Sequence, residues 1–64
     1  MNSKVFIRIK DKETGYESSE VTIEDLIYNQ NEIAFEFIED SSALPYKDFL
    51  FYQDDYEVIV RIGE

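Results

Sequence analysis

Residues 41–54 read SSALPYKDFLFYQD, and residues 18–31 read SSEVTIEDLIYNQN. Placed against each other without a gap, the two stretches agree in chemical class at most positions. In each, apolar side chains recur at intervals of three and four residues, which is the spacing of one face of a helix. We therefore predict two short helices, at 23–29 and 46–52. The letters FLFY in the second stretch would also fit a strand, so helix and strand both stay open there.

Strict alternation of apolar and polar side chains follows each of these stretches. Residues 32–38 and 56–62 both alternate in this way and are rich in aromatic and β-branched types. A period of two with such residues is typical of a strand with one buried face. Each predicted helix is thus followed by a predicted strand, so the sequence suggests a repeated αβ unit, in 22–39 and 45–62.

A hairpin is predicted ahead of the two units. Residues 4–10 alternate cleanly, and a turn with Gly15 at its end leads into a polar return strand at 16–21. The hairpin would therefore occupy residues 4–21. We expect one α+β domain over residues 1–64, with a single small, mainly antiparallel sheet in ββαβαβ order. Both helices should lie on one face of that sheet.

The apolar face of each predicted element defines the expected core. A chain of 64 residues buries only about 60% of its unfolded surface, so its core must be small. The sequence contains neither Cys nor His, which leaves no disulfide, and we expect no metal and no cofactor. The residues expected to be buried are Val5, Ile7, Ile9, Leu26, Ile33, Phe35, Phe37, Phe49, Val58 and Val60.

Oligomerisation is the remaining support for so small a fold. The outer face of the predicted sheet would carry apolar side chains among charges of both signs, which suits a self-complementary contact around a two-fold axis. We therefore predict a homodimer. The residues predicted to form its interface are Phe6, Arg8, Glu36, Ile38 and Ile59.

Charge is distributed unevenly along the chain. The net charge is −9, and four of the six cations lie in the first twelve residues, against Asp11 alone. Residues 13–64 hold fourteen acids and only Lys47 and Arg61. Such a field repels nucleic acids and anionic membranes and favours a protein partner with a basic surface. Acidity that serves solubility alone explains the composition equally well. The predicted partner-binding residues are Glu17, Glu20, Glu24 and Asp25.

No constellation of catalytic residues is evident. There is no His to act as a base near neutral pH, and the serines have only acids for neighbours. We therefore expect a protein that is not an enzyme. No apolar run approaches the roughly 18 residues that span a bilayer, and no leader-like segment opens the chain, so we expect a cytoplasmic protein.

The dipeptide Glu17-Ser18 near an edge strand, followed by a short helix and a strand, is similar to the phage-encoded uracil-DNA glycosylase inhibitors. The likeness extends to that dipeptide and that order of elements, and we infer no membership from it. The resemblance implies an inhibitor or regulator that mimics the charge of nucleic acid. An accessory protein of a phage or mobile element would fit this hypothesis. The alternative hypothesis is a self-associating assembly module with no enzyme target.

Overall fold

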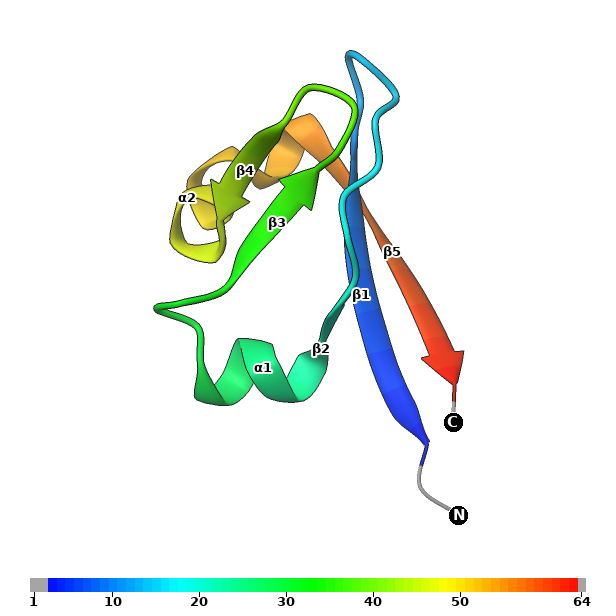
Figure 1. Cartoon of the computed structure of the whole chain (residues 1–64), viewed down its shortest axis with the longest axis vertical. Helices are drawn as coiled ribbons and strands as arrows, with labels where there is room; N and C mark the ends of the chain where they lie inside the picture. The colour runs from blue at the N-terminus through cyan, green and yellow to red at the C-terminus, as the bar shows by residue number, and fades with distance from the viewer. Residues whose placement is uncertain (1–2, 64) are drawn as a thin grey trace.

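The protein is described by a computed structural model that covers residues 3–63. Figure 1 shows two long strands along one side; a two-stranded sheet and the second helix lie beside their upper part, and the first helix lies beside their lower part. Eight elements follow one another along the chain. They are β1 (Lys4–Asp11), β2 (Val21–Thr22), α1 (Ile23–Tyr28), β3 (Ala34–Phe37), β4 (Ser42–Pro45), α2 (Tyr46–Tyr52), the 3-10 turn η1 (Gln53–Asp55) and β5 (Tyr56–Gly63).

The strands form two antiparallel sheets. The large sheet has the order β2-β1-β5, and the small sheet pairs β3 with β4. In the large sheet β1 and β5 pair over their whole length, from Lys4 opposite Gly63 to Asp11 opposite Tyr56. The α+β class and the mainly antiparallel pairing are as predicted. The prediction of a single sheet is wrong, because β3 pairs with β4 and not with the hairpin.

Strand β4 is a strand that the sequence did not predict, and with it the order of strands and α-helices becomes ββαββαβ. A tight turn at Asp40 and Ser41 creates it. The Asp40 carboxylate accepts hydrogen bonds from the Ser42 amide, at 3.1 Å, and from the Ser42 hydroxyl, at 2.6 Å. Ser41 has a φ of 55°, a left-handed conformation that usually signals Gly. The sequence did not predict this turn, because it contains no Gly and is stabilised by the hydrogen bonds of the Asp40 side chain.

Both predicted helices are present, and α2 has the predicted bounds. α1 begins where its cap was expected, since the Thr22 hydroxyl accepts a hydrogen bond from the Asp25 amide at 3.2 Å. The helices do not share one face of one sheet, however. α1 packs against β1 and β2, whereas α2 packs against β4. The structure accordingly does not confirm the repeated αβ unit, although the two helices begin 23 residues apart.

The predicted return strand 16–21 is mostly irregular. Regular pairing with β1 is limited to Val21 and Thr22, with one isolated bridge between Lys10 and Glu17. In between, the chain makes its bonds through two serines (Ser18 and Ser19), which contact β1 and β3 respectively. Figure 1 shows this segment running between β1 and β3. It therefore joins the two sheets and does not simply extend the large one.

The core lies where the small sheet and α2 cover the upper end of the large sheet. Its fully buried side chains are Ile9 and Phe35, and Phe37 and Phe49 are nearly so. The Phe35 and Phe49 rings pack edge to face, with 5.4 Å between centroids, and Phe49 also contacts Tyr56 at 6.0 Å. Aromatic pairs in this geometry stabilise beyond the area they bury. These four buried residues were predicted correctly.

The predicted burial of β5 is wrong. Val58 and Val60 are 53% and 58% exposed. The alternating pattern identified the apolar face correctly, because Val58 lies opposite Ile9 and Val60 opposite Ile7. The covering elements reach over β1 but leave β5, the edge strand, open. Alternation thus predicts which face of a strand is apolar, and the neighbouring elements decide whether that face is buried. The other residues predicted in the core, Val5, Ile7, Leu26 and Ile33, are half-buried.

We predict that Phe35→Ala will lower the free energy of unfolding by roughly 3–5 kcal/mol, because it opens a cavity at the centre of the core. The matched control is Phe51→Ala, since Phe51 is 84% exposed. It should cost less than about 1 kcal/mol. Urea denaturation measures both. Equal losses for the two variants would contradict the location of the core.

Candidate partner-binding surfaces

Two of the four acids predicted to bind a partner are held by arginines of the same chain. Arg8 donates from Nε to Glu17 at 2.8 Å, and its Nη1 lies 3.6 Å from Glu20. Arg61 donates from Nε and Nη2 to both carboxylate oxygens of Glu20, at 2.9 and 2.8 Å. Its guanidinium also lies over the Phe6 ring, 4.3 Å from the centroid. These five residues form an Arg–Glu cluster on the outer face of the large sheet.

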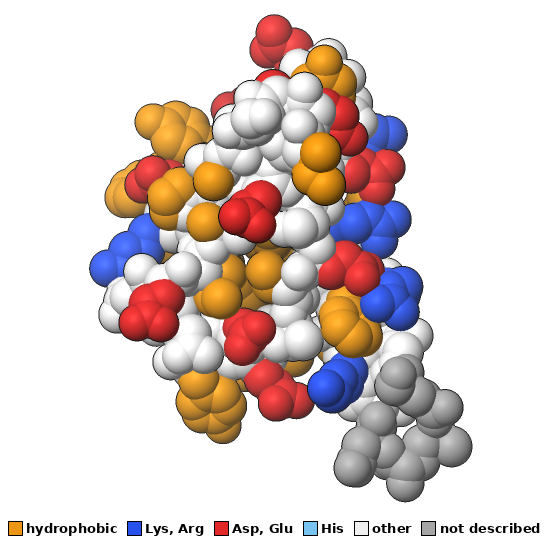
Figure 2. All heavy atoms as spheres, in the orientation of Figure 1, with side chains coloured by type: hydrophobic (Ala, Val, Ile, Leu, Met, Phe, Trp, Pro, Cys, Tyr) orange, Lys and Arg blue, Asp and Glu red, His pale blue; other side chains and the backbone are white. Residues whose placement is uncertain are grey.

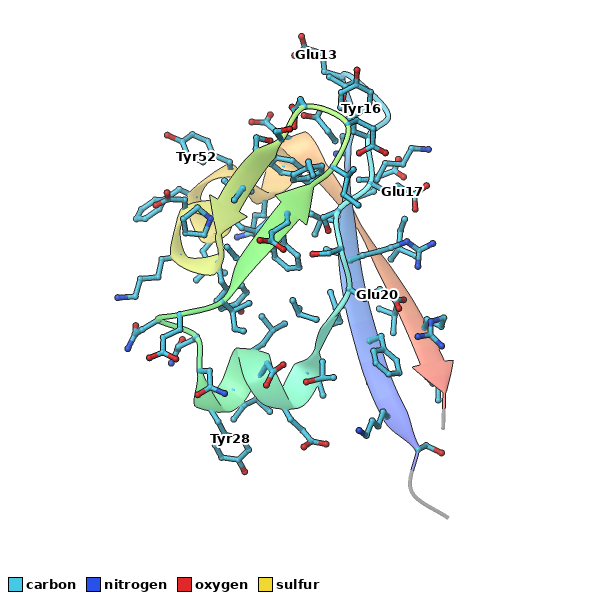
Figure 3. All side chains as sticks on the ribbon, in the orientation of Figure 1. Glu13, Tyr16, Glu17, Glu20, Tyr28 and Tyr52 are labelled. Atoms are coloured by element: carbon cyan, nitrogen blue, oxygen red, sulfur yellow. The ribbon has the colours of Figure 1, made fainter. Side chains whose placement is uncertain are left out.

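The cluster shifts the proton affinity of its members. Hydrogen bonding to Arg8 lowers the pKa of the Glu17 carboxyl, and hydrogen bonding to Arg61 lowers the pKa of Glu20. The same bond to Glu20 raises the pKa of the Arg61 guanidinium. Figure 3 shows Glu17 and Glu20 one after the other along β1. Their negative charge is therefore balanced locally, which makes them weaker contributors to a long-range field. In the sequence, the opposite charges of Arg8 and Glu17 on the two strands of the predicted hairpin already indicated that these side chains could pair.

The other two predicted acids lie in the first turn of α1. Glu24 is exposed, and Asp25 is half-buried with its amide bonded to Thr22. Carboxylates in the first turn of a helix are favoured by the helix dipole, so this placement has a structural reason of its own. The structure thus brings Glu17 and Glu20 together and leaves Glu24 and Asp25 at a separate place.

A second group of acids surrounds Tyr56, where β1 ends and β5 begins. We call it the acidic end: Asp11, Glu13, Asp40, Asp54 and Asp55. Four of them line a hollow with Lys12 and Tyr56. The Lys12 side chain donates to the Asp54 carbonyl at 2.8 Å, so this cation is drawn to the backbone. Figure 3 shows Glu13 at the tip of the loop that follows β1. The sequence did not reveal the group, because its members lie far apart in the chain.

Tyr56 reports the electrostatic character of the acidic end. Burial raises the pKa of its hydroxyl, and the carboxylates of Asp11, Asp55 and Asp40 raise it further. Asp11 lies opposite Tyr56 in the pairing of β1 with β5, and Asp55 directly precedes it in the chain. Asp11 also has a structural role, since its carboxylate accepts from the amides of Glu13 and Thr14 at 2.8 and 3.2 Å. The turn that follows β1 therefore fixes the positions of Asp11 and Glu13.

The residues predicted for self-association do not form one face. Phe6, Arg8 and Ile59 share the outer face of the large sheet, because Arg8 lies opposite Ile59. Glu36 is on β3 and Ile38 is in the turn after β3, so neither is part of the large sheet. Ile38 is 86% exposed beside a shallow hollow next to β4. The predicted interface therefore divides into two separate surfaces.

Within residues 3–63, no group of three or more acidic side chains is arranged to hold a metal ion. The helices described there are six and seven residues long, and none is long and apolar enough to cross a membrane.

The exposed tyrosines, whose rings could stack on the bases or side chains of a partner, are dispersed. Figure 3 shows Tyr16, Tyr28 and Tyr52 on three different parts of the molecule, so they do not combine into one stacking platform.

Comparison of the chain with protein-family models, with curated proteins and with solved structures finds no match. The resemblance to uracil-DNA glycosylase inhibitors accordingly gains no support from these comparisons.

We predict that Glu20→Gln will destabilise the protein in a pH-dependent way. The lowered pKa of Glu20 means that its carboxylate stabilises the fold above its ordinary pKa of about 4.5. That contribution is lost as the pH falls through the lowered value. The difference in free energy of unfolding between the parent and Glu20→Gln should therefore be largest near neutrality and shrink in acid.

The matched control is Glu32→Gln, which removes an exposed carboxylate with no ion pair within the described part of the chain. Its difference from the parent should be smaller. Urea titrations across the acid range measure both variants. A difference for Glu20→Gln that stayed constant from neutral to acid pH would contradict the Arg61–Glu20 bond.

Proposed function

We propose that this protein is a small non-enzymatic binding protein whose partner is a protein with a basic surface. The observation that supports the proposal best is the separation of charge on the folded chain. Lys4, Arg8, Lys10 and Arg61 all lie on β1 and β5, where Glu17 and Glu20 pair with the two arginines. Figure 2 shows most of the basic side chains along that side of the molecule.

The negative charge of the acidic end is therefore only weakly balanced by cations. Four of its five carboxylates line one hollow beside Tyr56, and among the residues that line this hollow Lys12 is the one cation. A field of one sign at one end of a small protein speeds and orients encounter with a surface of opposite sign. We place the main partner contact at the acidic end. This location differs from the predicted residues Glu17 and Glu20, whose charge is already engaged.

The finer proposal is that the partner binds nucleic acid, and that the carboxylates occupy the place of phosphates in its groove. A partner of this kind would release DNA when this protein binds. The alternative, a self-associating module, is favoured by a different observation, the open edge of β5, and it uses a different surface.

We predict that neutralising the acidic end will slow association with the partner by roughly tenfold at low salt, because steering depends on the local field. The variant combines Glu13→Gln, Asp54→Asn and Asp55→Asn. Proteins captured on the immobilised parent are purified, and association rates are measured at low and high salt, with and without competing DNA.

The control removes the same charge elsewhere, through Glu24→Gln, Glu32→Gln and Glu36→Gln, and should slow association less. A larger loss with this control would overturn the placement at the acidic end. Affinity that does not change with salt, or a partner whose contact surface is neutral or acidic, would contradict the proposed function itself.

A further inference from the structure

Strand β5 ends the large sheet and has an open side. Its eight residues, Tyr56–Gly63, pair with β1 along their whole length, and no other strand among residues 3–63 pairs with them. The backbone groups on the other side are available to a further strand. Natural proteins usually shorten, cover or bend such an edge, because a long open edge recruits another chain. β5 is therefore the place where this fold is incomplete.

Apolar side chains line the open strand on the face that also forms the core. Val58, Val60 and Ile62 are 53%, 58% and 71% exposed. Register places them opposite Ile9, Ile7 and Val5 respectively, and directly opposite residues share a face of the sheet. A strand added beside β5 would continue this face and pack its own apolar side chains against the row. The small core of four buried residues gives such an addition a thermodynamic reason.

The charges of β5 indicate which chain that strand belongs to. Glu57 and Arg61 are opposite in sign and stand two residues before and two residues after Ile59. In an antiparallel pair of two identical strands centred on Ile59, each Glu57 would face the Arg61 of the other copy. The strand is therefore its own electrostatic complement, which few unrelated strands would be. Opposite charges in facing positions stabilise a strand pair, and like charges destabilise it.

We propose that a second copy of this chain pairs its β5 with this β5, antiparallel and about a two-fold axis at Ile59. The two large sheets would join into one continuous sheet of six strands. On the core face, Val58 of each copy would pack against Val60 of the other, and Tyr56 would lie opposite Ile62. On the outer face, two Glu57–Arg61 pairs would flank the two Ile59 side chains.

Two features of the chain suit this arrangement. Arg61 uses Nε and Nη2 for Glu20 and its side chain is half exposed, which leaves Nη1 as the donor that the Glu57 carboxylate of a second copy would use. In addition, β1 and β5 carry four of the six cations of a protein with net charge −9. Two copies that meet along β5 therefore bring their least negative parts together. The contact along β5 does not involve the acidic end, where the proposed partner binds.

Charge reversal tests the register. The parent should sediment as a dimer at micromolar concentration. Glu57→Arg and Arg61→Glu should each weaken the dimer by roughly tenfold or more, because each places like charges opposite each other twice. An equimolar mixture of the two variants should recover the dimer, since every facing pair is then one Arg and one Glu. Sedimentation equilibrium measures all four samples, and circular dichroism confirms that each variant is folded.

A cysteine test does not depend on Arg61, which also binds Glu20. The chain has no native Cys, so Ile59→Cys introduces a single thiol at the proposed axis. Directly opposite residues of paired strands have Cα atoms about 4.5–5.5 Å apart, within the range of a disulfide. Mild oxidation should crosslink Ile59→Cys nearly completely, whereas Ser42→Cys on the small sheet should remain largely uncrosslinked.

A parent that sediments as a monomer at hundreds of micromolar would overturn the proposal, even if β5 bound an extended segment of another protein. A dimer that Glu57→Arg leaves intact, or one in which Ile59→Cys crosslinks no faster than Ser42→Cys, would overturn it as well. If Arg61→Glu fails to fold, Glu57→Arg and the cysteine pair decide the outcome.

Discussion

Two neighbouring serines connect the two sheets of this protein. Ser18 exchanges bonds with β1, since its hydroxyl accepts from the Ile9 amide at 2.9 Å and its amide donates to the Ile9 carbonyl at 2.8 Å. Ser19 binds β3 in the same way: its amide donates to the Glu36 carbonyl at 2.8 Å, and its hydroxyl accepts from the Glu36 amide at 3.3 Å. Ser18 is buried, so losing its hydroxyl would leave the Ile9 amide without a partner, which is costly in a core. The docking of the small sheet depends on this link.

The same segment organises the charges of the protein. Glu17 and Glu20 flank the two serines, and the link holds them beside Arg8 and Arg61. The basic strand is thereby neutralised on one side, while the acids around Tyr56 remain concentrated at one end. Because the link also ties the small sheet to β1, the covering elements stop short of β5. The acidic end and the open edge are thus two consequences of one arrangement.

Sequence reasoning succeeded where the cause is local. The intervals of three and four residues predicted both helices, and alternation predicted the buried positions Ile9, Phe35 and Phe37. It failed where the cause lies elsewhere in the chain. The exposure of Val58 and Val60 depends on how far other elements reach, and the acidic end depends on the register of β1 and β5. Ser18-Ser19 and Ser41-Ser42 are identical pairs in the aligned stretches, yet the first pair joins sheets and the second forms a turn.

Amide hydrogen exchange in Ser18→Ala tests the role of the serine link most directly. If Ser18 joins the sheets, its loss should lower protection of Ile9 on β1 and of Phe35 and Phe37 on β3 together, as one cooperative unit. Thr14→Ala removes a hydroxyl from an exposed turn outside both sheets and should leave those three amides close to the parent. Reduced protection confined to Ile9, with β3 unchanged, would contradict the claim that this link couples the two sheets.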